Sequence, residues 1–170
     1  MAVVALGIGS NINAVANISR AVKSLKLHFG NLELSPVYQS EAVGFDGDDF
    51  LNLVALVNVE DDIGRLSRIL KKLEDQQGRD RTAEKFSGRT LDIDVLIYDE
   101  LQGIYSGMTL PRPEITENAY VLLPLSQILP EVIHPLLHKT YRQLWKEYEP
   151  SRQKLQEIEI DWNCKQGISD

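Results

Sequence analysis

Residues 88–99 read GRTLDIDVLIYD and combine the pattern of a buried strand with two aspartates. If the segment is extended, the aliphatic residues at odd positions from 91 to 97 lie on one face of a sheet, and Asp92 and Asp94 lie on the other. Aspartate is depleted in strands, so a pair at positions i and i+2 needs a specific reason. This strand therefore decides both the fold and the place to look for a function.

The segments before this strand complete a recognisable order of elements. An apolar run at 3–8 is followed by a helical stripe from Val15 to Phe29 that ends at Gly30. Further elements are expected as a strand at 32–38, at a sheet edge because of Pro36, a strand at 50–59, and a helix from Ile63 to Gly78 capped by Asp61 or Asp62. The order strand, helix, strand, strand, helix, strand predicts an α+β fold with a ferredoxin-like βαββαβ core and an antiparallel sheet.

In this pattern both helices cover one face of the sheet, and the second face is predicted to be open. The first strand sends Gly7 and Gly9 to that face, the third sends Asn52, and the fourth sends Asp92 and Asp94. Small residues at the centre of a sheet indicate close approach by another group. We therefore expect a floor of small residues with Asn52 on one side and the two carboxylates on the other, about 10 Å apart.

The C-terminal part of the chain is less regular. Residues 99–113 are expected to form a loop, followed by a helix from about Thr116 that is interrupted at Pro124. Another helix is expected at 141–148, and the alternation EIEIDW at 157–162 indicates a late strand. The 170 residues, 43% of them hydrophobic, are expected to form a single domain over 1–170.

Composition limits the partners of the chain. Its formal net charge of −7 disfavours binding to nucleic acid or to an anionic membrane surface. The sequence contains no apolar run of the roughly 20 residues that a membrane span needs. Cys164 is the only cysteine, which fits a reducing compartment. We expect a cytoplasmic protein that acts on small molecules, with a monomer favoured.

Two carboxylates one pleat apart can bind Mg²⁺, which takes one or two protein carboxylates and completes its shell with water and phosphates. The loop before the strand carries Arg79, Arg81 and Arg89, whose guanidinium groups suit phosphate oxygens. Cations beside a carboxylate pair are what phosphoryl transfer needs. The alternative is a solvated face on which Asp92 and Asp94 pair with neighbouring arginines, beside a charged loop that only confers solubility.

Other motifs are weak. The segment from Gly7 to Asn11 matches neither the dinucleotide-binding nor the P-loop pattern. His134 and His138 are four residues apart, but Pro135 lies between them and no third ligand is evident, which disfavours a zinc site. No aromatic pattern typical of RNA-binding domains is present.

Taken in order, five blocks of the sequence resemble the 6-hydroxymethyl-7,8-dihydropterin pyrophosphokinase family of folate biosynthesis. The strongest is QQGRDR followed by GRTLDIDVLIY, and the resemblance covers roughly residues 5 to 135. The other similar blocks are LGIGSN, SPVYQSEAVG, FLN and AYVLLPLSQILP. The resemblance implies a three-layer α-β-α domain with C-terminal helices that transfers pyrophosphate from ATP to the hydroxymethyl group of the pterin, giving AMP.

The resemblance also implies roles for individual residues. Asp92 and Asp94 match the ligands of two Mg²⁺ ions, and they join Arg79, Arg81 and Arg89 as the expected catalytic residues. The expected ATP-binding residues are Glu74, Arg79, Arg81, Phe86, Arg89, Val95, Thr109 and Arg112. The expected pterin-binding residues are Ser40, Val43, Phe50, Asn52 and Tyr120, with Phe50 and Tyr120 sandwiching the ring and Asn52 binding its polar edge.

Some positions depart from the family pattern. Phe86 stands where tryptophan is usual, Lys71 where glutamine is usual, and Glu41 where proline is usual. Arg112 and Asn118 replace a histidine and an arginine, so one cation is lost at 118. By analogy with a lost oxyanion donor, that loss costs on the order of 100-fold in rate if nothing compensates. Two other readings stay open: a non-catalytic or altered-substrate pterin or nucleotide binder, and a ferredoxin-like interaction module.

Overall fold

The structure, a computed structural model, describes residues 1–41, 48–77, 91–148 and 153–162. Its sheet has the strand order β5-β1-β4-β3-β8, all neighbours are antiparallel, and β2 also pairs with β4. This order, with β1 and β4 at the centre, confirms the predicted ferredoxin-like arrangement. The elements are β1 Ala2–Ser10, α1 Ala14–Phe29, β2 Glu33–Leu34, β3 Val37–Ser40, β4 Phe50–Val59, α2 Ile63–Gln76, β5 Asp92–Tyr98, β6 Gly103–Tyr105, β7 Met108–Leu110, α3 Glu114–Glu117, α4 Ala119–Ile128, α5 Tyr141–Glu147 and β8 Gln156–Ile158.

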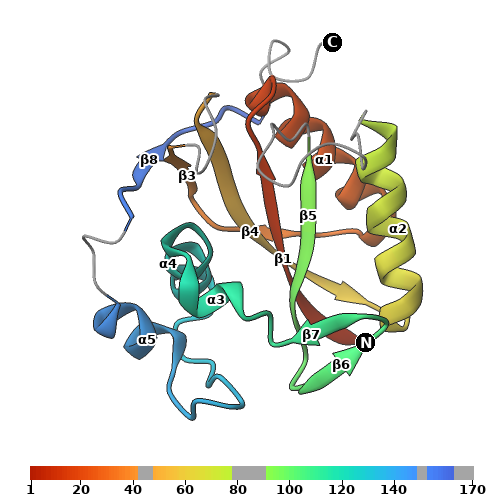
Figure 1. Ribbon diagram of the computed structural model, residues 1–170. Helices are drawn as coiled ribbons and strands as arrows, with labels where there is room; N and C mark the ends of the chain where they lie inside the picture. Colours follow the sequence, from red (N-terminus) through yellow and green to blue (C-terminus); the bar gives the residue numbers. More distant parts are fainter. Residues whose placement is uncertain (42–47, 78–90, 149–152, 163–170) are drawn as a thin grey trace.

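Helices cover both faces of the sheet, so the domain has three layers (Figure 1). Helices α1 and α2 lie on one face, and α3, α4 and α5 lie on the other. Each face has its own hydrophobic core, and the core under α1 and α2 is the larger. None of the described helices is long and apolar enough to cross a membrane.

The core under α1 and α2 follows the predicted alternation of the central strands. It contains the even-numbered residues of β1 from Ala2 to Ile8 and the odd-numbered residues of β4 from Leu51 to Val59. Helix α1 ends at Gly30, as predicted, with φ of 87°. The prediction was wrong for Val15, which is exposed, because Ala14 packs against the core at the first turn of the helix.

Helix α2 confirms the predicted N-terminal cap. The Asp62 carboxylate accepts a hydrogen bond from the Arg65 backbone N–H at 2.9 Å. Leu66 and Leu70 are buried against the sheet. The predicted C-terminal cap was Gly78, which lies outside the described residues; the capping residue of the structure is Gln77.

Strand β5 departs from strict alternation near its end. Its odd residues up to Val95 pack under α2, but Leu96 and Ile97 both belong to the core on the other face. The register explains this, because Ala5 pairs with Ile97 while Leu6 pairs with Val95. The extra residue forms a bulge, which turns Ile97 to the face opposite from the predicted one.

The segment predicted as one edge strand at 32–38 is two short strands. The strand is interrupted at Ser35 and Pro36. There the Ser35 hydroxyl accepts a hydrogen bond from the Val54 backbone N–H at 2.8 Å. Strand β3 is also not an edge, because β8 pairs with its outer side. A late strand is present and occupies this edge, but it covers only Gln156–Ile158, so most of the alternation at 157–162 is not in a strand.

Two predictions for the C-terminal part were wrong. Residues 99–113 contain a hairpin of β6 and β7, joined by Ser106 and Gly107, which both have positive φ as a type I′ turn requires. Pro124 does not interrupt its helix, because α4 continues to Ile128 and packs its apolar residues against the sheet. The boundary lies instead at Asn118, between α3 and α4.

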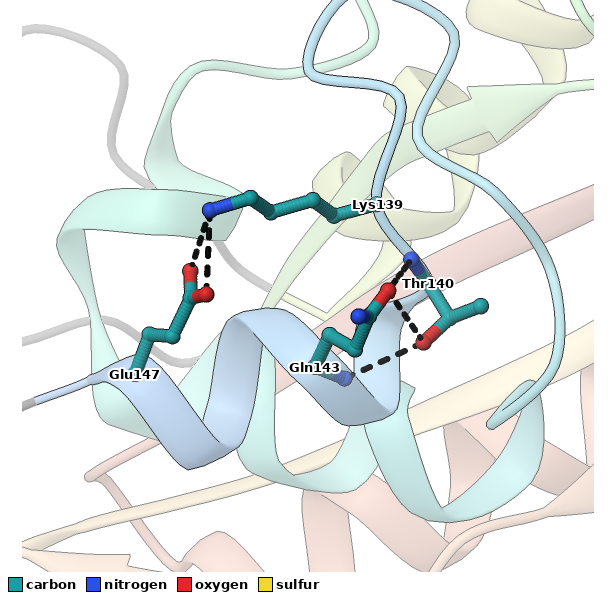
Figure 2. Close-up of polar contacts among 4 residues, drawn as sticks. All are labelled: Lys139, Thr140, Gln143 and Glu147. Atoms are coloured by element: carbon teal, nitrogen blue, oxygen red, sulfur yellow. Dashed lines mark hydrogen bonds and ion pairs between the residues drawn. The ribbon is translucent and has the colours of Figure 1, made fainter.

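Helix α5 confirms the predicted helix at 141–148 and is fixed at both ends (Figure 2). At its start, the Thr140 hydroxyl accepts a hydrogen bond from the Gln143 backbone N–H at 3.1 Å, and the Gln143 side chain accepts from the Thr140 backbone N–H at 3.2 Å. This is a capping box. At its end, the Lys139 ammonium contacts the Glu147 carboxylate at 2.7 Å, which ties the preceding loop to the helix.

Candidate active site

A cavity of about 710 Å³ lies over the part of the second face where the sheet carries small and polar residues. Its floor is the one predicted from the sequence, since Gly9 pairs with Asn52 on one side and with Asp92 on the other. Gly7 lies opposite Asp94. A methyl group at Gly9 would collide with the Asn52 Oδ1 atom, so glycine at this position leaves the Asn52 side chain in its place.

The prediction that the whole second face is open was wrong. Where the cavity ends, Val54 and Leu96 still line it, and with Ala5 they pack under Ile115 and Leu122 of α3 and α4. The change from glycine and aspartate to larger apolar residues along the strands therefore sets where the cavity ends. The C-terminal helices lie on this face of the sheet (Figure 1) and pack on its apolar part, and the cavity lies over its small and polar part.

The carboxylate pair of β5 lines this cavity. Asp92 is partly buried, whereas the side chain of Asp94 is 56% exposed and its Oδ1 atom lies 3.4 Å from the Arg112 Nη2 atom. Arg112 is held by the Val95 carbonyl oxygen, which accepts from its Nε atom at 3.3 Å, and by Glu114 at 3.9 Å. The donor set fits a divalent cation, because carboxylate oxygens face a cavity and already attract a positive group.

Glu74 is a buried residue of α2, the helix that packs against β5. Its Oε2 atom accepts a hydrogen bond from the Ile93 backbone N–H at 2.8 Å, between the two aspartates. Glu74 also lines the cavity. The side chain therefore fixes the strand that carries the carboxylate pair, a role that the sequence pattern did not indicate.

The residues expected to bind the pterin also meet at this cavity. Ser40, Phe50, Asn52 and Tyr120 all contribute to its lining. Burial raises the pKa of the Tyr120 phenol, and the negative charges of Glu114 and Asp94 raise it further. The phenol therefore stays protonated at neutral pH and can donate a hydrogen bond. Phe50 and Tyr120 line the cavity from β4 and α4, respectively.

The structure separates one expected ATP-binding residue from the others. Thr109 is exposed on β7, and its neighbour Met108 lines the cavity instead, because successive residues of a strand point to opposite faces. Val95 and Arg112 do line the cavity. The remaining predicted site residues lie outside the described part of the chain: Val43, Arg79, Arg81, Phe86 and Arg89.

Three positions that depart from the family pattern also line the cavity, namely Glu41, Lys71 and Asn118. Several further lining residues were not predicted from the sequence, among them Gln153, which follows α5. Its side chain donates a hydrogen bond to the Asn118 Oδ1 atom at 3.1 Å. The late strand indicated that the tail returns to the sheet, but nothing in the sequence around Gln153 indicated contact with the cavity.

Fold and cavity together define a ferredoxin-like α+β domain that brings a carboxylate pair and aromatic side chains to one cavity. The family model of 7,8-dihydro-6-hydroxymethylpterin-pyrophosphokinase (HPPK) matches residues 5–130. The chain belongs to this family.

Named relatives agree with this family. The chain is 33% identical over 152 residues to the 2-amino-4-hydroxy-6-hydroxymethyldihydropteridine pyrophosphokinase of Aquifex aeolicus, covering 88% of this chain and 92% of the relative. It is 34% identical over 143 residues to the enzyme of the same name from Synechocystis, covering 82% and 72%.

Solved structures show the same fold. A crystal structure of Plasmodium falciparum HPPK-DHPS superposes with a TM-score of 0.66 at 16% identity and covers 89% of this chain. The match spans 43% of that Plasmodium chain, so the present chain corresponds to less than half of its length. At this identity the likeness supports the fold alone.

Proposed function

We propose that this cavity carries out the magnesium-dependent transfer of pyrophosphate from ATP to 6-hydroxymethyl-7,8-dihydropterin. The transfer itself, a step of folate biosynthesis with ATP as co-substrate, is the reaction of the family to which the chain belongs. The magnesium dependence and the residue roles below are our proposals. They rest on the register of the central strands. Asp92 lies opposite Gly9, Asp94 lies opposite Gly7, and Asn52 lies on the other side of Gly9, all at one cavity.

Asp92 and Asp94 are proposed to hold the divalent cation, two ions in the full complex. The part of the chain that the structure describes contains no group of three or more metal-binding side chains, so phosphate oxygens and water would complete the shell, as is usual for Mg²⁺. A bound cation supplies neutralisation of the charge on the phosphates. Glu74 keeps the two carboxylates in place through its hydrogen bond to Ile93.

Arg112 is proposed to take up charge on the transferred group. Its contacts with Asp94 and with the Val95 carbonyl group hold its guanidinium beside the carboxylate pair, where the phosphates are proposed to bind. Arg79, Arg81 and Arg89 are proposed to add further positive charge. Together these side chains do what phosphoryl transfer requires of a protein, which is positioning and electrostatic stabilisation.

Asn52, Phe50 and Tyr120 are proposed to place the pterin, with Ser40 and Val43 as further contacts. The ring would lie between the two aromatic side chains, and Asn52 would bind its polar edge above Gly9. The hydroxymethyl oxygen then attacks the β-phosphorus, the bond between that phosphorus and the α-phosphate oxygen breaks, AMP leaves, and the hydroxyl proton is released. Holding both reactants in this order supplies much of the rate.

The test is the formation of AMP from ATP, Mg²⁺ and 6-hydroxymethyl-7,8-dihydropterin, followed by chromatography. We expect AMP that depends on the pterin in the wild-type protein and no AMP with Asp92→Ala. The matched control is Glu60→Gln, which removes a carboxylate charge at an exposed position just after β4. Binding of the pterin without any AMP would overturn the proposed reaction and favour the non-catalytic binder.

We also propose that the protein is cytoplasmic and monomeric. A single cysteine in 170 residues supports a reducing compartment. Sedimentation of the purified protein tests the monomer, and a dimer mass at micromolar concentration would contradict it.

A further inference from the structure

The chain returns to the cavity after α5. Strand β8 pairs with β3 at the edge of the sheet, on the side of the molecule where α4 lies (Figure 1). The Tyr38 hydroxyl donates to the Gln127 side chain at 2.6 Å and lies 3.4 Å from the Glu157 carboxylate, so β3, α4 and β8 are joined at one point. Gln153 comes just before β8 and lines the cavity.

The side chain of Gln153 binds the start of α4 with both of its polar atoms. Its Oε1 atom accepts a hydrogen bond from the Ala119 backbone N–H at 2.7 Å, and its Nε2 atom donates to the Asn118 Oδ1 atom at 3.1 Å. The residue that precedes α4 is Asn118, and its own side chain makes no cap hydrogen bond. Gln153 therefore satisfies a backbone N–H that the helix leaves free at its first turn.

This arrangement fixes the orientation of the Asn118 amide. An asparagine side chain has one acceptor oxygen and one NH₂ donor group. The oxygen of Asn118 is bound to Gln153, so the amide presents its Nδ2 donor group on the other side. Asn118 and Gln153 both line the cavity, and Tyr120 of the same helix does so as well.

We propose that Gln153 is a positioning residue that turns the Asn118 amide so that its Nδ2 group donates a hydrogen bond to a substrate in the cavity. The ligand chemistry is a hydrogen-bond acceptor atom, which is either a triphosphate oxygen of ATP or a carbonyl or ring nitrogen of the pterin. The inference rests on the proposed function, because it takes the substrates from it. It assigns a role to the tail beyond residue 152 in substrate binding.

Gln153→Glu separates this role from a purely structural one. A glutamate still accepts the hydrogen bond from Ala119, and a negative charge at a helix N-terminus is favourable, so we expect a melting temperature equal to or above that of the wild type. A carboxylate cannot donate to the Asn118 oxygen. The Asn118 amide is then expected to turn and present its oxygen, which weakens binding of the substrate that it contacts by about 10-fold. Gln156→Glu, the same change at an exposed position of β8, is the matched control.

The measurement is calorimetric titration with two probes, α,β-methylene-ATP with Mg²⁺ and, separately, 6-hydroxymethylpterin. Weaker binding of one probe by Gln153→Glu, with Gln156→Glu like the wild type, supports the inference and identifies the ligand. Asn118→Asp removes the Nδ2 donor directly and must weaken the same probe. Unchanged binding of both probes in either variant, or an equal loss in Gln156→Glu, would overturn it.

These titrations do not require turnover. A wild-type protein that binds both probes but forms no AMP refutes the proposed reaction and leaves the role of Gln153 standing. A wild-type protein that binds neither probe refutes both. A loss seen only in the melting temperature, with binding intact, would show that Gln153 merely caps α4.

Discussion

The two faces of the sheet are built from the same strands, and they do different things. Toward α1 and α2, β1, β4 and β5 present an unbroken apolar surface that buries residues such as Leu6, Leu53 and Ile93. Toward α3 and α4, the same strands present glycine, asparagine and aspartate at one end and apolar residues such as Ala5 and Val54 at the other. One face stabilises the fold, and half of the other is left to bind ligands.

This comparison shows that adjacent residues of one strand carry separable roles. Ile93 packs in the core, while Asp92 and Asp94 on either side of it face the cavity. A substitution at Asp92 or Asp94 should therefore affect chemistry, and one at Ile93 should affect stability.

Asp94→Asn should cause the largest change. The substitution keeps the size of the side chain but removes a charge that the proposed cation needs, so we expect turnover to fall by about 1,000-fold. Because Asp94 is largely exposed, the thermal midpoint should stay close to that of the wild type. Steady-state AMP formation and thermal melting measure the two effects. Activity within a few-fold of the wild type would end the metal assignment.

Leu66→Ala should lower stability and leave turnover unchanged. Leu66 is fully buried under the other face, so removing its side chain is expected to lower the free energy of unfolding by about 3 kcal/mol. The catalytic constants of the folded fraction should not change, since the residue does not line the cavity. Urea denaturation followed by circular dichroism gives the first value. A large loss of turnover in fully folded protein would show that the two faces are coupled.

Gly9→Ala and Gly7→Ala form a matched pair on the cavity floor. A methyl group at Gly9 would displace the Asn52 side chain, whereas one at Gly7 would meet Leu96 at an ordinary contact distance of 3.4 Å. We expect Gly9→Ala to weaken binding of 6-hydroxymethylpterin by about 10-fold, through loss of one hydrogen bond, and Gly7→Ala to have a smaller effect. Fluorescence titration with the pterin measures both. Equal losses would mean that Asn52 does not bind the ring.

Tyr141→Phe should have the smallest effect at neutral pH. Tyr141 is fully buried in the core under α4, and its hydroxyl has no hydrogen-bond partner among the described residues, so the loss of the hydroxyl should change stability by less than about 1 kcal/mol.

Tyr141 should affect stability mainly at alkaline pH. Burial raises the pKa of its phenol well above the ordinary value of 10. The unfolded chain therefore loses this proton as the pH rises through 10 while the folded chain keeps it, so the stability falls with pH above 10. Above pH 10 the free energy of unfolding should fall less steeply with pH in Tyr141→Phe than in the wild type. The two slopes should differ by about 1.4 kcal/mol per pH unit. Tyr105→Phe, on the β6–β7 hairpin, is the control, and equal slopes in the two variants would contradict the prediction.

Much of this architecture could be predicted from the sequence, because it depends on local patterns. The alternation in β4, the helical stripe ending at Gly30 and the cap at Asp62 each specify their own element. The cavity floor followed from parity once the strand order was inferred, because a side-chain period of two leaves no choice of face.

What the sequence did not predict depends on contacts between distant segments. The bulge that turns Ile97 over is set by the register with Ala5, and neither strand shows it alone. Pro124 is tolerated inside α4 because that helix is packed against the sheet. Gln153 reaches Asn118 from 35 residues away, and no local signal marks such a contact.

The proposed reaction depends most on Asp92 and Asp94 holding a divalent cation at the cavity. A crystal structure of the protein with Mn²⁺, α,β-methylene-ATP and 6-hydroxymethylpterin tests it directly, because Mn²⁺ accepts the same oxygen ligands as Mg²⁺ and scatters anomalously. The account predicts anomalous density against both carboxylates, with the phosphates on the metal and the pterin over Gly9. Metal density away from both carboxylates, with nucleotide bound, would contradict it.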